Sequence, residues 1–106
     1  LVVGGAGPLT EHLRSKSFVR YLGLIPHATA HTFYEKIDLF VLPSLTKPFW
    51  KEQFGRVITE ALGAGKPVIG SDSGSIPEVL EKLGLDWTYP ELSPGDLSRT
   101  IIRVWN

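Results

Sequence analysis

Short apolar runs that end in glycine, proline or serine alternate along this chain with longer stretches of helical spacing. The short runs lie at 1–3, 17–22, 38–42, 67–70 and 87–89, and the longer stretches at 9–15, 28–36, 54–64, 75–83 and from 93 onward. This alternation is typical of strand–helix–strand units, whose strands run parallel. We therefore predict one continuous α/β unit with a mostly parallel sheet.

Local signals mark the ends of two predicted helices. Gly65 follows the 54–64 stretch and is predicted to end that helix in a left-handed C-cap, while Pro67 prevents its continuation. Ser75 followed three residues later by Glu78 predicts a capping box at the start of the next helix.

Burial is also predicted by apolar spacing. The run at 67–70 and, after Asp38, the run at 38–42 are continuously apolar, as in strands that are covered on both faces. In the last helix, we expect Leu97, Ile101 and Val104 to share the inner face.

Composition excludes several classes of function. The 106 residues fit one domain, and 42% apolar with 21% charged residues is ordinary for a globular chain. Eleven basic and eleven acidic side chains cancel, which argues against binding to nucleic acid or an anionic membrane surface. The absence of cysteine excludes disulfides and thiolate metal sites and permits a cytosolic setting. The longest apolar runs reach about five residues, against the ~20 that a membrane span requires.

A glycine-rich turn follows the first apolar run. Gly5 and Gly7 let backbone approach a phosphate at the start of a helix. The dinucleotide-binding fingerprint needs a third glycine, and Pro8 removes one amide donor. The residues alone leave two alternatives, a plain strand-to-helix turn and a ligand contact.

Glu52 and Glu60 flank the start of the predicted 54–64 helix. The first amides of that helix lack intrahelical acceptors and lie at the positive end of the dipole, where anions bind. Gly55 permits close approach to this backbone, and Glu60 lies about 9 Å along the helix from its start. This layout fits a nucleoside diphosphate sugar. The alternative is a solvated Glu52 and a surface ion pair at Glu60.

Several ordered segments strengthen the functional alternative. They are residues 3–8, 19–25, 42–44, 52–61, 65–74 and 76–78. In order and spacing they resemble the C-terminal, donor-binding domain of retaining GT-B glycosyltransferases, specifically the family 4-like glycosyl transferases group 1. The resemblance covers nearly the whole chain. It implies an α/β fold with a Rossmann-like, doubly wound and mostly parallel sheet. It also implies that 1–106 is a single partial nucleotide-sugar-binding domain, with the first strand, the first helix and a basic diphosphate clamp upstream of Leu1.

The resemblance also assigns roles to individual residues. Glu52 is implied as the catalytic residue, which binds donor-sugar hydroxyls near the reacting centre, and Glu60 would bind the ribose hydroxyls. Backbone around Leu24 and Ile25 would contact the nucleobase. The donor-binding residues that we expect are Gly7, Leu24, Ile25, Phe54, Gly55, Arg56, Val57, Glu60 and Ser71.

The implied reaction transfers a sugar from a nucleotide diphosphate donor to a glycan, lipid or other acceptor with retention of configuration, as in polysaccharide biosynthesis. Neither a cofactor nor a metal is expected. The acceptor would bind a missing N-terminal domain, so this chain alone would be inactive. We expect a cytoplasmic location, with peripheral attachment to the inner membrane face through the missing half as an option.

Two alternatives remain from other classes: a nucleotide-sugar epimerase of the same architecture, and a non-catalytic nucleotide-binding α/β module. Gln53 is bulkier than the family's usual residue there, and the 46–51 stretch is longer than its commonest form. These departures leave the donor sugar open.

Overall fold

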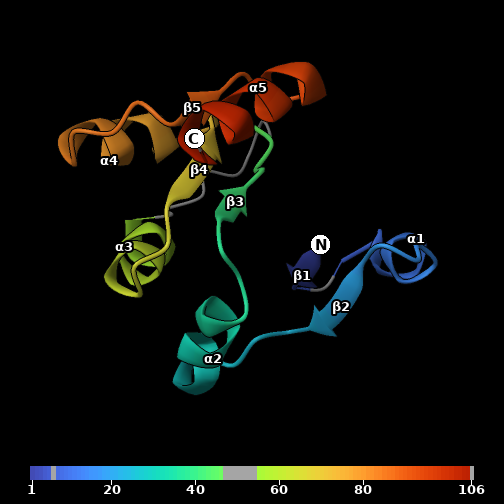
Figure 1. Cartoon of the computed structure of the whole chain (residues 1–106). Coiled ribbons are helices and arrows are strands. Elements are labelled where there is room, and N and C mark those ends of the chain that lie inside the picture. The colour runs from blue at the N-terminus through green and yellow to red at the C-terminus, as the bar shows by residue number, and fades with distance from the viewer. Residues whose placement is uncertain (6, 47–54, 106) are drawn as a thin grey trace. The chain divides into compact units, whose positions relative to one another are not determined.

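The structure is a computed structural model that describes residues 1–5, 7–46 and 55–105. The chain forms two compact units, Leu1–Asp38 and Leu39–Asn106. Each unit is a small α/β assembly with its own parallel sheet (Figure 1). The α/β class and the parallel strands are thus confirmed, while a single partial domain over 1–106 stays a prediction.

The described residues of the first unit form five elements. They are β1 (Val2–Gly4), α1 (Thr10–Arg14), β2 (Arg20–Gly23), the 3-10 helix η1 (His27–Thr29) and α2 (Ala30–Glu35). β1 and β2 pair in parallel, and Val2 lies opposite Arg20. β2 begins later than the run at 17–22 predicts because the ladder starts where Arg20 donates its N–H to the carbonyl of Leu1 at 2.7 Å.

The interior of the first unit is small. Tyr34 is its buried aromatic residue, and the Phe33 ring meets the Tyr34 ring edge-on with 5.5 Å between centroids. Gly4 leaves room for Ile25, since a Cβ at position 4 would lie 2.8 Å from Cγ1 of Ile25. The side chain of Ile25 therefore packs over the end of β1.

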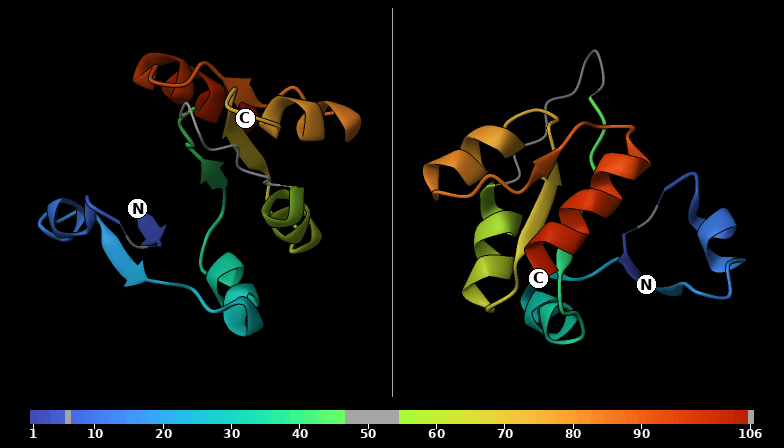
Figure 2. Two further views of the ribbon diagram at one scale, coloured as in Figure 1. Left: turned by 180° about the vertical axis from the view of Figure 1, so that it is seen from behind. Right: turned by 45° about the horizontal axis from the view of Figure 1, so that its top comes forward.

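The second unit continues the alternation of strand and helix. Its elements are β3 (Phe40–Leu42), α3 (Gly55–Gly63), β4 (Val68–Ser71), α4 (Ile76–Lys82), β5 (Thr88–Tyr89) and α5 (Pro94–Trp105). The strands pair in the order β3-β4-β5, and both ladders are parallel. α3 and α4 pack beside each other on one side of β4, and α5 lies on the other side (Figure 2).

β4 forms the centre of the second unit. All four of its residues are buried, as the apolar run at 67–70 predicts. The fully buried side chains around it come from β4 itself and from α3 and α4: Val68, Ile69, Ile58, Ala61, Ile76 and Leu80. β3 is only half-buried, contrary to the prediction for 38–42, because it is an edge strand of its sheet.

The predicted helix ends meet different outcomes. Gly65 adopts a φ of 79°, which confirms the left-handed C-cap of α3. The prediction of a capping box at Ser75 is wrong. Ser75 occupies the N-cap of α4 with φ −87° and ψ 0°, a helical conformation in which its side chain makes no capping hydrogen bond. Glu78 instead pairs with Lys82 at 3.1 Å.

The last helix agrees with its predicted inner face. Leu97, Ile101 and Val104 are half-buried, whereas Ile102 is exposed. Thr100 is also buried, and its hydroxyl donates to the carbonyl of Asp96 at 2.8 Å. That bond satisfies a polar group which the apolar pattern did not predict to be inside.

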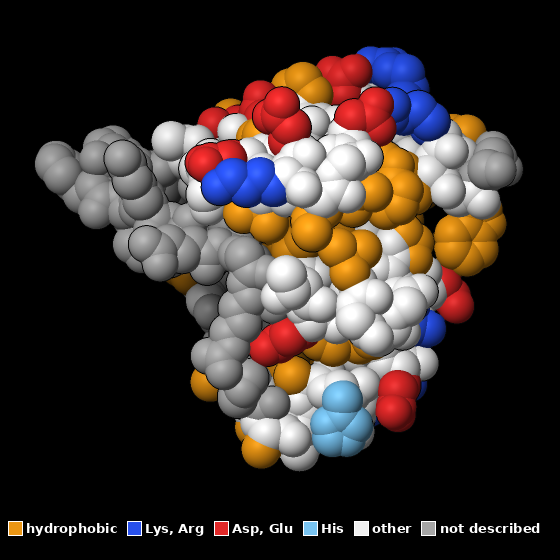
Figure 3. All heavy atoms as spheres, turned by 90° about the vertical axis from the view of Figure 1, so that its left-hand side faces the viewer, with side chains coloured by type: hydrophobic (Ala, Val, Ile, Leu, Met, Phe, Trp, Pro, Cys, Tyr) orange, Lys and Arg blue, Asp and Glu red, His pale blue; other side chains and the backbone are white. Residues whose placement is uncertain are grey.

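The described surface carries both signs of charge. Figure 3 shows basic and acidic side chains side by side along the upper rim of one face, with apolar side chains exposed below them. None of the helices in the described residues has the length and apolar character that crossing a bilayer requires.

Candidate functional site

The carboxyl ends of the three parallel strands of the second unit meet at one edge of the sheet. Polar residues follow each strand there: Ser44 and Thr46 after β3, Asp72 and Ser73 after β4, and Glu91 after β5. This edge is where ligands bind in open α/β sheets, and the sequence placed Ser71 beside it.

Hydroxyl groups join the first two of these strand ends. Ser71 is fully buried, and its Oγ donates to the backbone carbonyl of Ser44 at 2.7 Å. The hydroxyls of Thr46 and Ser73 share a hydrogen bond of 3.0 Å. Ser71, which we expected to bind the donor, thus uses its side chain within the chain, and a donor contact at this position stays a prediction.

Carboxylates join the third strand end to the others. Glu91 accepts the backbone N–H of Thr46 at 2.6 Å through Oε2, and the N–H of Glu91 donates to Oδ1 of Asp72 at 2.9 Å. Asp72 in turn donates its own N–H to the carbonyl of Tyr89 at 2.9 Å. Burial raises the pKa of the Tyr89 phenol, and the negative charge of Asp72 raises that pKa further.

α3 spans Gly55–Gly63 in the described residues, and its predicted first residue, Phe54, lies outside them. The backbone of Gly55, Arg56 and Val57 forms the first described turn of this helix, and the amides of the first turn of an α-helix have no acceptor within it. Glu60 is half-buried on the same helix, about 7.5 Å from Gly55 along the axis at 1.5 Å per residue. The predicted contacts at Glu52 and Phe54 lie outside the described residues.

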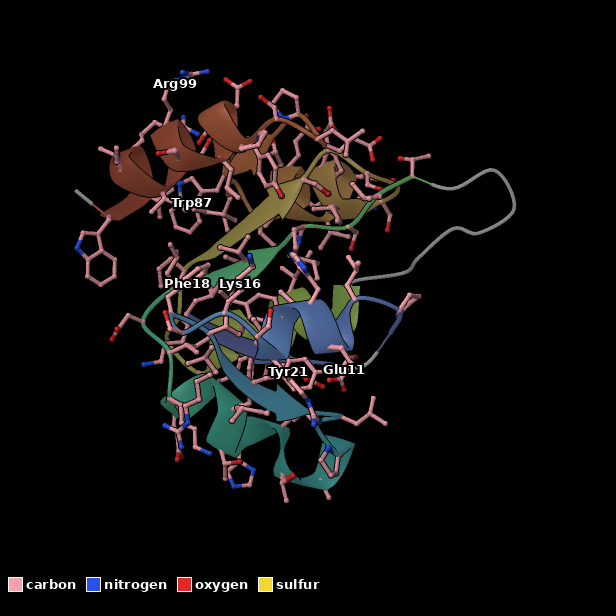
Figure 4. All side chains as sticks on the ribbon, turned by 90° about the vertical axis from the view of Figure 1, so that its right-hand side faces the viewer. Glu11, Lys16, Phe18, Tyr21, Trp87 and Arg99 are labelled. Carbon is pink, nitrogen blue, oxygen red and sulfur yellow. The ribbon has the colours of Figure 1, made fainter. Side chains whose placement is uncertain are left out.

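In the first unit, side chains fix the glycine-rich turn. The Gly7 N–H donates to Oγ1 of Thr10 at 3.1 Å, and that hydroxyl donates back to the Gly7 carbonyl at 2.8 Å. Tyr21 of β2, which is labelled in Figure 4, donates its phenol to the carbonyl of Gly5, and its hydroxyl oxygen lies 3.0 Å from Oγ1 of Thr10. These bonds favour the plain-turn alternative, and a ligand contact at Gly7 stays a prediction.

The two residues proposed for base contact differ in exposure. Leu24 is 76% exposed directly after β2, so its side chain is open to a ligand. Ile25 is half-buried, with its side chain against Gly4.

Comparison with known proteins identifies the chain's relatives. The family model described as glycosyl transferases group 1 matches residues 1–106. This chain belongs to that family. The match agrees with the parallel α/β architecture of both units.

Several curated proteins that are similar to this group 1 chain are named as glycosyltransferases. An uncharacterized glycosyltransferase of Methanocaldococcus jannaschii is 30% identical, over 98% of the chain and 27% of the relative. The gpi3 subunit of phosphatidylinositol N-acetylglucosaminyltransferase from Schizosaccharomyces pombe is 32% identical, over 97% and 23%. O-antigen chain mannosyltransferase B of Escherichia coli is 36% identical, over 73% and 19%. The group 1 chain thus spans about a quarter or less of these relatives.

The described part of the group 1 chain holds no cluster of three or more histidine, aspartate and glutamate side chains with metal-binding geometry. Its predicted site residues are distributed over both units. Gly7, Leu24 and Ile25 belong to the first, and Val57, Glu60 and Ser71 to the second.

Sequence reasoning missed Thr10, Tyr21, Thr46 and Glu91 as residues that fix these turns. Thr46 and Glu91 could have been found, because both follow predicted parallel strands within a few residues. Tyr21 carries no such signal, since an aromatic residue in a strand ordinarily indicates packing.

Proposed function

We propose that this chain supplies the donor-binding half of a retaining GT-B glycosyltransferase of the family 4 type. The reaction transfers a sugar from a nucleotide diphosphate donor to a glycan or lipid acceptor. The observation that carries this proposal is the match of the group 1 family over residues 1–106, on a parallel sheet whose β3 leads into α3 with Glu60. Relatives named for O-antigen and phosphatidylinositol support these acceptor classes.

Charge explains how α3 would serve such a donor. The diphosphate gains negative charge as it leaves the sugar, and fixed amides at a helix N-terminus stabilise charge that develops there. The first turn, from Gly55 to Val57, supplies such amides. The leaving diphosphate would help to deprotonate the acceptor, and no step requires a metal or a cofactor.

The two glutamates would bind opposite ends of the donor. Glu60, part-way along α3, would accept two vicinal ribose hydroxyls, a charge-assisted arrangement that is stronger than a neutral one. Glu52 would bind the sugar hydroxyls and stabilise the reacting centre. We place this reaction in the cytoplasm, with attachment to the inner membrane face through the acceptor-binding half.

The ribose role is tested by calorimetry on the intact protein that contains this chain. Uridine, guanosine and adenosine diphosphates are titrated into the wild type, Glu60→Ala and the control Glu81→Ala, whose side chain is exposed on α4. Loss of a charge-assisted hydrogen bond of about 1.5 kcal/mol predicts roughly tenfold weaker binding for Glu60→Ala alone. Equal binding by Glu60→Ala and the control would contradict the role.

The catalytic role is tested by sugar transfer. Glu52→Gln keeps the size of the side chain and removes its charge. Loss of one preorganised electrostatic contact typically lowers kcat by about 10²–10³. A Glu52→Gln enzyme that transfers sugar at the wild-type rate would refute the assignment.

A further inference from the structure

The two parallel strands of the first unit end side by side. β1 ends at Gly4, opposite Gly23 at the end of β2, so both carboxyl ends lie at one edge, where open α/β sheets bind ligands. Leu24 leaves this edge with 76% of its surface exposed. We propose that Tyr21 is a positioning residue that orients the backbone of Leu24 and thereby sets the preference for a nucleobase. The inference rests on the proposed function and on the base contact expected at Leu24.

Two glycines leave the strand ends without side-chain anchors. Gly5 and Gly23 have φ values of 120° and 74°, which glycine adopts without steric cost. A Cβ at either position would meet no atom within 4 Å, so packing on that side does not hold them. Their conformation therefore depends on hydrogen bonds to their backbone groups.

Tyr21 supplies the first of these hydrogen bonds. Its phenol donates to the carbonyl of Gly5, and the N–H of Gly5 donates to the carbonyl of Gly23 at 2.7 Å. The Gly23 carbonyl belongs to the planar peptide unit that also carries the N–H of Leu24. Two hydrogen bonds between described residues thus connect the Tyr21 hydroxyl to the direction of the Leu24 N–H.

The Tyr21 ring is itself fixed. Tyr21 lies opposite Val3 in the ladder of β1 and β2, and the guanidinium carbon of Arg14 is 5.1 Å from the centroid of its ring. The hydroxyl oxygen lies 3.0 Å from Oγ1 of Thr10. A phenylalanine at this position would keep the strand pairing and the cation–π contact, and would lose only the hydroxyl.

An oriented backbone N–H discriminates between bases. Uracil, guanine and adenine carry different donors and acceptors on their edges, and proteins read unpaired bases through hydrogen bonds to those edges. A site that hydrogen-bonds one ligand rejects an analogue that lacks the matching group. The exposed side chain of Leu24 adds an apolar contact for the face of the base. Base preference should therefore depend on how firmly the Leu24 N–H is oriented.

The experiment measures base preference in the intact protein that contains this chain. Calorimetry gives the affinities for uridine, guanosine and adenosine diphosphate, and the preference is the ratio of the highest to the lowest. Effects on ribose or diphosphate binding cancel in this ratio. Tyr21→Phe should reduce the preference about fivefold, as expected for one neutral hydrogen bond. The control Tyr34→Phe removes a phenol hydroxyl from a buried residue of the same unit and should leave the preference unchanged.

A second variant tests the path through Gly23. Gly23→Ala introduces no clash, but a φ of 74° is strained for alanine, so the peptide unit before Leu24 should turn. We expect this variant to reduce the preference as well. Because Tyr21 acts through the same peptide unit, adding Tyr21→Phe to Gly23→Ala should reduce the preference no further.

The remaining outcomes overturn the inference. Equal preferences in Tyr21→Phe and the wild type, or additive losses in the double variant, would remove the positioning role. A loss of preference in Tyr34→Phe as large as that in Tyr21→Phe would show a general loosening of the unit. In both cases weaker binding by Glu60→Ala would leave the proposed function standing. A wild type that binds all three diphosphates equally would also exclude the role of Tyr21, and one that binds none would refute the proposed function itself.

Discussion

The hydroxyl of Ser71, fully buried at the end of β4, donates a 2.7 Å hydrogen bond to the backbone carbonyl of Ser44 beyond β3. The bond links neighbouring parallel strands past the point where their ladder ends. It makes Ser71 part of the support of the sheet edge, whatever ligand that edge receives.

Ser71→Ala should lower the free energy of unfolding by about 1 kcal/mol, because the buried hydrogen bond from its hydroxyl to the carbonyl of Ser44 is lost. Urea unfolding measures this change. Ser15→Ala is a matched control, since the Ser15 hydroxyl donates to the His12 carbonyl at 2.6 Å on an exposed helix end. The control should stay within about 0.5 kcal/mol of the wild type. Equal losses in both variants would show that burial of Ser71 adds nothing.

Two glycine-to-alanine changes should have opposite signs. A Cβ on Gly70 of β4 would overlap Cγ2 of Ile76, and both residues are buried. Gly70→Ala should therefore cost about 1–3 kcal/mol through overpacking. A Cβ on Gly63 of α3 meets nothing within 4 Å, so Gly63→Ala should stabilise the helix by about 0.5–1 kcal/mol. Thermal unfolding of both variants checks the pair, and a stabilised Gly70→Ala protein would contradict the packing of α4 on β4.

Leu92 offers a test of backbone strain. It is 79% exposed with a φ of 64°, so little packing is lost when its side chain is removed. Relief of about 1–2 kcal/mol of left-handed strain should exceed the entropic cost of glycine, which is smaller. Leu92→Gly should thus raise the melting temperature. The control is Leu83→Gly, where φ is −91° and the same change should be destabilising. A lower melting temperature for Leu92→Gly would refute the strain.

Asp96 should make the free energy of unfolding depend on pH in the acid range. The Ser93 hydroxyl donates to Asp96 at 2.5 Å, and this bond, followed by that of Arg99, lowers the pKa of the Asp96 carboxyl. Arg99 projects outward from α5, as Figure 4 shows, and its ion pair with Asp96 is exposed. A folded pKa below the unfolded one gives stability that is present above the unfolded pKa. That stability disappears as pH falls through the folded pKa.

Asp96→Asn should therefore flatten the loss of stability between about pH 5 and about pH 2. Ser93→Ala should flatten it in part, because it removes the largest cause of the shift. Melting temperatures of the wild type and both variants, measured across this pH range, test the prediction. An acid limb as steep in Asp96→Asn as in the wild type would mean that other carboxylates account for it.

Local sequence signals predicted the types of element well and their ends less well. The run at 17–22 was correctly predicted to be a strand, but β2 starts at Arg20 because its partner ladder starts at Leu1. The run at 38–42 shortens to β3 for a similar reason. Phe40 donates to the carbonyl of Pro67, and proline has no N–H with which to extend the ladder. Strand length depends on the partner, which spacing within one segment does not reveal.

The candidate site shows the same limit. Sequence placed Glu60 on a helix and Ser71 at a strand end, and the structure confirms both positions. Sequence reasoning could not pair Glu91 with the amide of Thr46, because that contact joins loops 45 positions apart and one of its partners is a backbone group. Contacts of this kind depend on how three strands align, and composition or periodicity does not encode them.

The complete burial of β4 sets the order in which the second unit opens. Its amides are enclosed by β3, β5 and two helices, so they reach solvent only when the unit unfolds as a whole. In deuterium exchange, residues 68–71 should keep their hydrogens longest. In the first unit, the five-residue helix α1 contains no buried side chain, so its amide hydrogens should exchange first. The second unit would thus lose the carboxyl edge of its sheet, where the chain leaves β4, only in global unfolding.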